Sequence, residues 1–140
     1  MGMDYDKIDY SGIDHGNWGD WKGTDPEWEE IRKGITRVVF GMSAKTMSAT
    51  IGAIVEGHET KPHSHPNEQI VIIIQGTCDY YVDGKPIRCK PGTWIVVPPN
   101  VEHYIHVFNT EEPVLNIDIF TPVRPEYTET YTKYLKELEK

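Results

Sequence analysis

Hydrophobic residues in the middle of this 140-residue chain recur at every second position in short runs, which predicts β-strands. Between residues 47 and 55 apolar side chains alternate with smaller or polar ones, as expected for a half-buried strand. Turn-forming residues such as Gly76, Asp83-Gly84 and Pro91-Gly92 interrupt the runs. The further strands predicted in this way are 69–75, 78–82, 93–97, 104–108 and 114–120. Many short strands at this spacing favour an all-β sandwich or barrel.

The two ends of the chain lack this alternation. Residues 1–24 contain two of the four tryptophans and few aliphatic residues, which predicts an irregular arm. Asp25, Pro26 and Glu27 are typical of a helix start, and Trp28 and Ile31 would form the apolar face of that short helix. Near the C-terminus, apolar side chains recur at helical spacing, at positions Tyr127, Tyr131, Tyr134, Leu135 and Leu138. The predicted organisation is an N-terminal arm with a short helix (1–34), a barrel (35–122) and a C-terminal helix (123–140) packed on the barrel or on a partner subunit.

Composition and charge narrow the class of protein. A length of 140 residues fits one domain with a real core, and a net charge of −8 argues against a nucleic-acid-binding surface. The longest aliphatic run, residues 70–74, is too short to span a bilayer, and the first six residues are acidic. We therefore expect a cytoplasmic protein without membrane or nucleic-acid partners. Cys78 and Cys89 flank the predicted hairpin and are expected as buried free thiols, with a disulfide as the alternative.

A histidine-rich segment in the centre of the chain predicts a metal site. Because side chains alternate faces along a strand, His63, His65 and Gln69 can point to the same side. His103 would arrive from another strand and complete a set of three imidazoles and one amide oxygen. Such a set suits one divalent first-row ion, with zinc, iron, nickel, copper and manganese all compatible.

Two points in this segment leave alternatives. Glu68 adjoins Gln69 and carries the more usual ligand group, but strand alternation directs it to the opposite face. A bulge at Pro66-Asn67 would exchange the two, so Gln69 is the expected fourth ligand and Glu68 the alternative. His106 is expected on the face opposite His103, and His15 and His58 are interpreted as surface residues.

The spacing of glycines around these histidines resembles the sequence motifs of a known family. Gly57-x5-His63-x-His65-x3-Gln69-x6-Gly76 and Gly92-x5-Pro98-x-Asn100-x2-His103 resemble the two cupin motifs, separated by fifteen residues. The resemblance implies a double-stranded β-helix barrel, related to the jelly roll, with a metal inside its mouth. Two positions depart from the motifs. The usual carboxylate ligand falls at Gln69, and the usual glycine of the second motif is Asn100, a residue that tolerates a left-handed conformation.

Asp118 is a candidate for proton transfer. It shares a face of the last predicted strand with Phe120, and an inward orientation would bury it among apolar strands. Burial raises the pKa of a carboxyl group into a range useful for acid–base chemistry. The alternative is a structural aspartate paired with an arginine or a backbone amide.

A narrower resemblance supports a catalytic Asp118. The HxH motif, Gln69 and the stretch Asp118-x-Phe120-x3-Arg124 are similar to the pectin-degradation cupins, which help to convert 4,5-unsaturated monouronates into linear ketonised sugars. By position, the resemblance implies that Asp118 transfers the proton, Phe120 forms a pocket wall and Arg124 anchors the substrate carboxylate. An arginine fork suits a carboxylate.

These observations predict a metal-dependent isomerase or lyase acting by proton transfer on a small, anionic, carboxylate-bearing substrate of the unsaturated-uronate or keto-acid type. The alternatives are an Fe(II) dioxygenase and a non-catalytic cupin that binds or senses a small molecule. A homodimer is also expected. The exposed edge strands of a barrel must be covered, and the arm and the C-terminal helix are not needed to complete a single barrel.

Overall fold

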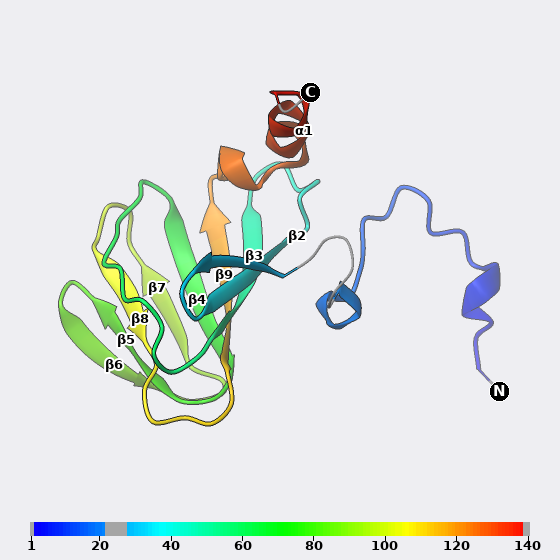
Figure 1. Ribbon diagram of the computed structural model, residues 1–140. Helices are drawn as coiled ribbons and strands as arrows, with labels where there is room; N and C mark the ends of the chain where they lie inside the picture. The colour runs from blue at the N-terminus through cyan, green and yellow to red at the C-terminus, as the bar shows by residue number, and fades with distance from the viewer. Residues whose placement is uncertain (1, 22–27, 139–140) are drawn as a thin grey trace.

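The computed structural model describes residues 2–21 and 28–138 and consists of two antiparallel β-sheets that face each other (Figure 1). The larger sheet has the order β1-β2-β3-β9-β4-β7 and the smaller one the order β6-β5-β8. The strands are β1 (Glu29–Arg32), β2 (Ile35–Phe40), β3 (Ser48–Ile54), β4 (Glu68–Gln75), β5 (Cys78–Val82), β6 (Lys85–Cys89), β7 (Trp94–Val97), β8 (His103–His106) and β9 (Val114–Thr121). The all-β jelly-roll architecture expected from the sequence is thus confirmed.

The apolar core lies between the two sheets. Val71 and Ile73 of β4 are fully buried there against Val97 of β7 and against Tyr80 of β5. The alternate residues of β4, Ile70 and Ile74, remain partly exposed on the outer face of the large sheet. Strand alternation therefore explains both the core and the apolar outer surface.

The hairpin between β5 and β6 turns at Asp83 and Gly84, which both have positive φ, as a two-residue hairpin turn of this kind requires. In its register Cys78 lies opposite Cys89. Both cysteines are free and buried, as expected.

The predicted short helix near residue 25 is partly wrong. Its start, residues 25–27, lies outside the described residues, and Glu29–Arg32 form strand β1 instead. Glu29 pairs with Arg37 and Arg32 pairs with Ile35, so hydrogen bonding to β2 overrides the local helix signal. The large sheet therefore includes residues before position 35, and the expected domain boundaries stay a prediction.

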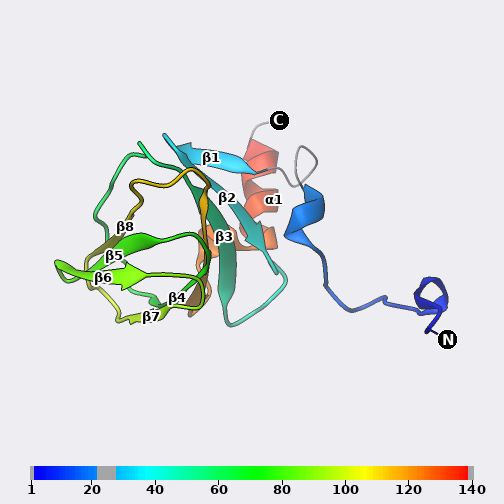
Figure 2. The same cartoon turned by 90° about the horizontal axis from the view of Figure 1, so that it is seen from below.

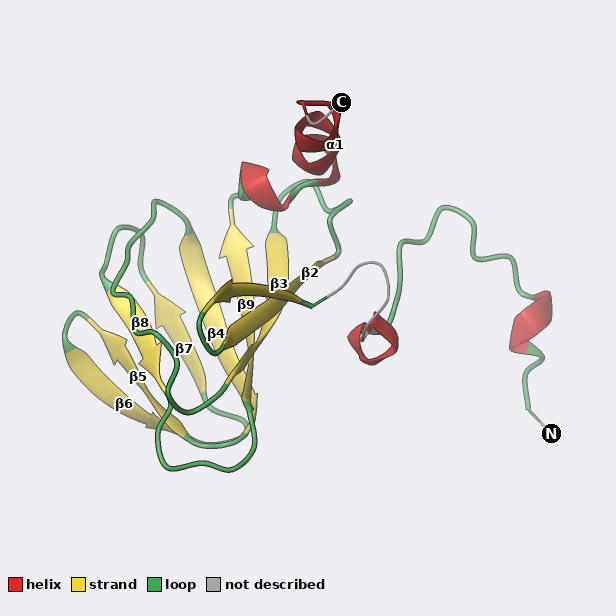
Figure 3. Cartoon of the chain, viewed as in Figure 1, coloured by secondary structure: helices red, strands yellow, loops and turns green. Residues whose placement is uncertain are grey.

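The arm and the C-terminal helix lie outside the barrel. The first half of the arm extends away from the body, mostly as loop, with a short 3-10 helix at Tyr5–Lys7 (Figures 1 and 3). Its second half contacts the body, because Asp14 accepts a hydrogen bond from Ser43 and the ring of Trp18, in a 3-10 helix at Trp18–Trp21, lies 5.5 Å from that of Phe40. The C-terminal helix α1 (Glu129–Leu138) follows a 3-10 turn at Pro125–Tyr127 and lies above the end of the large sheet in Figure 1, where Figure 2 shows the same helix from below. No helix in the described part of the chain is long and apolar enough to cross a membrane.

Candidate metal centre and its cavity

Backbone hydrogen bonds join the two histidine-bearing segments. His63 and His103 form an isolated antiparallel bridge, with N–H···O distances of 3.1 and 2.9 Å. The N–H of Asn100 donates to the carbonyl of His65 at 2.7 Å, and Asn100 has the left-handed φ of 65° that its place in the motif predicts. These backbone hydrogen bonds bring the imidazoles of the two segments together.

The three histidines His63, His65 and His103 form one cluster, with nitrogen atoms that lie within 4.8 Å of one another. Each imidazole uses Nδ1 to donate to a backbone carbonyl two residues away in the sequence. These bonds are His63 to Lys61 at 2.7 Å, His65 to Asn67 at 3.0 Å and His103 to Val101 at 2.8 Å. A proton on Nδ1 leaves Nε2 as a lone pair in the neutral ring, which is the form that binds a metal.

Two observations test whether these residues fit a cation. Nε2 of His103 is buried without a hydrogen-bond partner among the described residues. Nε2 of His65 lies 2.9 Å from Oε1 of Gln69, and both atoms present lone pairs, because the amide nitrogen of Gln69 donates elsewhere. Two acceptors at this distance repel each other unless a cation lies beside both. The donor set therefore fits a divalent metal ion.

Gln69 connects this cluster to a carboxylate. Its Nε2 donates to Oδ1 of Asp118 at 2.9 Å, and Nδ2 of Asn116 donates to Oδ2 at 3.0 Å. Gln69 is 3% exposed inside the barrel, whereas Glu68 is exposed. The structure thus places the amide, and not the neighbouring carboxylate, beside the histidines.

Burial sets the protonation of these groups. It lowers the pKa of His103 to about 4 and also lowers that of His63, which keeps these two imidazoles neutral at physiological pH. It raises the pKa of Asp118 to about 6, although the hydrogen bonds from Gln69 and Asn116 oppose the rise.

The wall beside Asp118 is aromatic and cationic. Phe120 is buried with its ring 5.4 Å from that of His65, and the guanidinium of Arg124 lies over Phe120 at 4.9 Å and over Tyr127 at 4.8 Å. Arg124 is held by its backbone N–H, which donates to Ser48 Oγ at 2.8 Å, and by Nε, which donates to Glu126 at 2.7 Å. The face of this guanidinium is therefore packed on rings while its side chain still borders the cavity.

These residues surround a cavity of about 220 Å³. Of the residues singled out in the sequence, His63, Gln69, Asp118, Phe120 and Arg124 line it, whereas His65 and His103 are buried and are not among its lining residues. The volume is smaller than that of a typical drug-sized site, so it suits a small molecule.

Several residues of this cavity were not singled out from the sequence, among them Tyr80, Arg32 and Arg37. Tyr80 lies buried with its ring stacked 6.3 Å from that of His103, and burial raises its pKa well above the usual range. Strand alternation with Cys78 would have placed it inside. Arg32 and Arg37 also line the cavity, and no motif in the sequence marks them.

The interpretation of His58 as a surface residue is wrong. His58 is 9% exposed, and its Nε2 accepts a hydrogen bond from the N–H of Val107 at 3.0 Å. Nδ1 contacts the carbonyl of Glu59 at 3.0 Å. Both ring nitrogens are therefore satisfied by backbone, and His58 has a structural role.

Comparison with known proteins agrees with this architecture. Residues 51–120 match the Cupin domain family model. The chain is 29% identical over 84 residues to dimethylsulfoniopropionate lyase DddW of Ruegeria pomeroyi, which covers 58% of this chain and 53% of that protein. It therefore spans about half the length of the curated relative it matches.

Solved structures show the same fold over most of the barrel. KdgF from a Halomonas species superposes with a TM-score of 0.64 at 25% identity, covering 74% of this chain and 93% of that one. An RmlC-like cupin from Shewanella frigidimarina gives 0.63 at 26% identity, with coverages of 73% and 88%. Matching motifs, fold and histidine cluster together show that this chain belongs to the cupin family and resembles its KdgF-type members.

Proposed function

We propose that this cupin is a metal-dependent isomerase or lyase that transfers a proton on a small, carboxylate-bearing substrate of the unsaturated-uronate or keto-acid type. The observation that carries the proposal is the link through Gln69. Its amide oxygen lies 2.9 Å from Nε2 of His65 and its amide nitrogen 2.9 Å from the carboxylate of Asp118. A titratable carboxylate is thus held one side chain away from the metal-binding cluster.

The residues divide into four roles. His63, His65, Gln69 and His103 would hold one divalent transition metal, and the ion would supply a positive charge that polarises a carbonyl or enol oxygen. Because all four ligands are neutral, they leave that charge uncompensated and favour an anionic oxygen ligand.

The other residues act on the substrate directly. Asp118 would hold and move the proton, since burial keeps its pKa close to neutral and it borders the cavity. Phe120 forms the wall against which the substrate packs, and Arg124 binds its carboxylate. The relatives support the reaction class: one is a lyase, and another is a KdgF protein.

The test begins with the metal content of protein purified without added metal, which we expect to approach one divalent ion per chain. Turnover is then followed by ultraviolet absorbance on a panel of unsaturated uronates and 2-keto acids. Asp118→Asn should keep the fold and the metal but lose turnover by roughly 10²–10⁴-fold, because the amide cannot accept the proton. Arg124→Ala should mainly raise KM. Asp83→Asn, an exposed hairpin residue, is the matched control.

Other outcomes would replace the proposal. Bound iron with oxygen consumption and no turnover on the panel would indicate a dioxygenase. Tight binding of a small acid without either activity would indicate a binding or sensing protein.

We also propose that the protein forms a homodimer. Ile70, Ile74, Val96 and Trp94 leave an apolar strip exposed on the outer face of the large sheet, with Trp94 70% exposed. The first half of the arm, which extends away from its own barrel, carries further exposed apolar side chains at Met3, Tyr5, Ile8, Tyr10 and Ile13 (Figures 1 and 2). A second copy would cover both surfaces. Light scattering at micromolar concentration checks this, and a monomer would contradict it.

A further inference from the structure

Positive charge is concentrated in the cavity of a protein that is acidic as a whole. The net charge of the chain is −8. The cavity is nevertheless lined by four cationic side chains, Arg32, Arg37, Lys61 and Arg124, and by only two carboxylates, Glu59 and Asp118. The uronate carboxylate of the proposed function needs one of these cations, Arg124. The proposed function assigns no role to Arg32, Arg37 or Lys61.

These cations form two groups. Arg37 and Arg124 share Tyr127: Nη1 of Arg37 donates to the tyrosine hydroxyl at 2.6 Å, and both guanidinium groups lie over its ring. Arg124 also lies over the ring of Phe120, which follows Asp118 by two residues on β9, so this pair lies at the Asp118 side of the cavity. Arg32 instead lies beside the segment that leads to His63. The carbonyl of Lys33, the next residue, accepts from the N–H of Glu59 at 2.9 Å, and the carbonyl of Lys61 accepts from Nδ1 of His63 at 2.7 Å.

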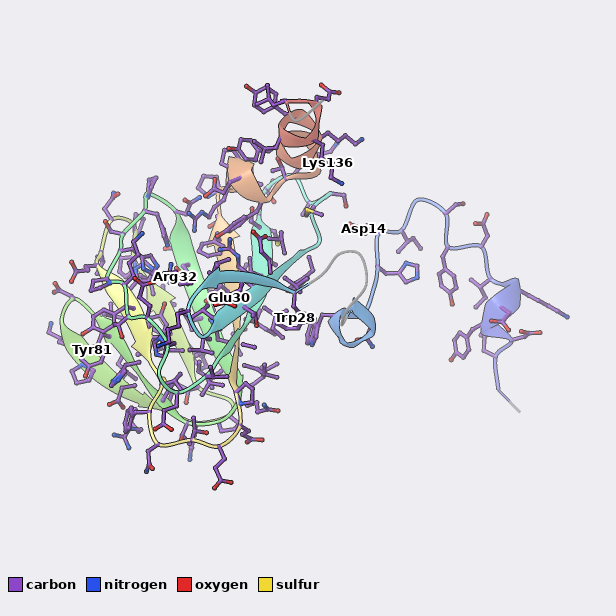
Figure 4. The ribbon with its side chains drawn as sticks, viewed as in Figure 1. Asp14, Trp28, Glu30, Arg32, Tyr81 and Lys136 are labelled. Atoms are coloured by element: carbon purple, nitrogen blue, oxygen red, sulfur yellow. The ribbon has the colours of Figure 1, made fainter. Side chains whose placement is uncertain are left out.

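The side chain of Arg32 is directed into the cavity by a β-bulge. Glu30 pairs with Thr36, but the next pair joins Arg32 to Ile35, so the register shifts between them. Ile35 points into the core, and the shift places Arg32 on the same side. Bulges of this kind re-aim a side chain and are frequent beside active sites. Figure 4 shows Arg32 at the end of β1, over the space between the two sheets.

The hairpin that carries Arg32 is fixed in place. Glu59 N–H donates to the carbonyl of Lys33 and Val55 N–H to that of Gly34, each at 2.9 Å. Gly34 approaches His58 so closely that a Cβ there would lie 2.7 Å from the His58 Cα. The position of Arg32 is therefore predetermined.

The group at the His63 side has no anionic partner in the described part of the chain. Nε of Arg32 is buried without a hydrogen bond. Neither Arg32 nor Lys61 is in any ion pair between described residues. A buried guanidinium nitrogen without an acceptor is costly, and an anionic ligand would remove that cost.

We propose that the cavity takes a small dianion, with its carboxylate at Arg37 and Arg124 and a second anionic group, carboxylate or phosphate, at Arg32 and Lys61. This inference rests on the proposed function for the first carboxylate only. It narrows the substrate from any unsaturated or keto acid to one that carries a second negative group at the far end of the molecule.

The test measures binding, not turnover. Wild-type, metal-loaded protein is titrated calorimetrically with malonate, succinate, glutarate and adipate, and with monocarboxylates of the same chain lengths. At the length that spans the two groups, the diacid should bind about tenfold more tightly than its monoacid, as expected for one additional charge-assisted contact. Phosphoglycolate against glycolate distinguishes a phosphate from a carboxylate as the second group.

Variants locate the second group. Arg32→Gln should abolish the preference for the diacid while leaving monoacid affinity unchanged, and Arg32→Lys should keep part of it. Lys33→Gln, which removes the same charge from the adjacent exposed position, is the matched control. The inference is overturned if diacids and phosphoglycolate bind no better than the monoacids, or if Lys33→Gln has the same effect as Arg32→Gln. A preference for dianions without turnover of unsaturated uronates or keto acids would contradict the proposed reaction but would still support this inference.

Discussion

His103→Leu separates the metal-binding role of the histidine cluster from its contribution to folding. His103 is 0% exposed, and its Nε2 has no partner among the described residues. Leucine has a similar volume and no nitrogen atoms. The variant loses the bond to the Val101 carbonyl, which costs about 1 kcal/mol, but it also removes an unsatisfied buried acceptor that costs about 1–3 kcal/mol. The metal-free variant should therefore be about as stable as metal-free wild type.

In the presence of metal, wild type and His103→Leu should differ strongly in stability. Structural metal sites of four ligands bind with about 10–16 kcal/mol, so one ligand contributes on the order of 3 kcal/mol, or about a hundredfold in Kd. At a metal concentration of about 100 Kd the wild type gains roughly 2.7 kcal/mol, while the variant, then near its own Kd, gains about 0.4 kcal/mol. For a chain of this length that corresponds to a Tm rise of about 10 °C against about 1–2 °C.

The assay is thermal unfolding of chelator-treated protein with increasing zinc, nickel or manganese, together with metal analysis after gel filtration. His106→Leu is the control, because His106 lies exposed on the same strand. If His103→Leu keeps a full equivalent of metal and the full Tm rise, His103 is not a ligand and the assignment of the cluster fails.

Three further predictions concern the fold around the site. Burial lowers the pKa of His103 from 6.5 to about 4, so the unfolded chain binds more protons than the folded chain between about pH 6.5 and pH 4. The free energy of unfolding of the metal-free protein, measured by urea denaturation, should therefore fall by up to about 3 kcal/mol as the pH drops through this range. His103→Leu should make this fall smaller. Gly34→Ala should lower the free energy of unfolding by more than about 2 kcal/mol, because both the φ of 76° and the nearby His58 backbone oppose a Cβ. Gly41→Ala is the control, since Gly41 has a φ of 64° but open space around it, and should cost about 1 kcal/mol. Equal losses in the two variants would contradict the close approach of Gly34 to His58. Burial raises the pKa of Cys78 to about 12 and also that of Cys89, so a thiol reagent at pH 8 should label neither until the protein is unfolded, and rapid labelling of native protein would refute this.

The strands could be predicted where alternation and turn residues agree. The predicted strand 78–82 coincides with β5, and that at 114–120 falls one residue short of β9. The failed helix beyond residue 28 has a different cause, since a partner strand decides the conformation of Glu29–Arg32 and the local sequence does not show that partner. Local propensity is a weak guide where tertiary pairing is available.

The candidate site was predictable to the extent that its residues lie in a motif with fixed spacing. Gln69 and His103 are brought to the histidine cluster by strand alternation, which the sequence shows directly. The position of Arg32 in the cavity could not have been predicted, because its direction depends on a β-bulge for which the sequence contains no characteristic residue. His58 was misjudged because the acceptor role of its Nε2 depends on Val107, a residue far away in the sequence.

The β1–β2 hairpin has an evolutionary consequence. The histidine cluster, Gln69 and Asp118 all fall within residues 51–120, the segment shared with the family, whereas Arg32 and Arg37 come from a hairpin outside it. The length and charge of this hairpin can therefore change between relatives while the histidine cluster stays unchanged. If the cavity takes a dianion as proposed, grafting the hairpin onto a related barrel should transfer the preference for the second anionic group.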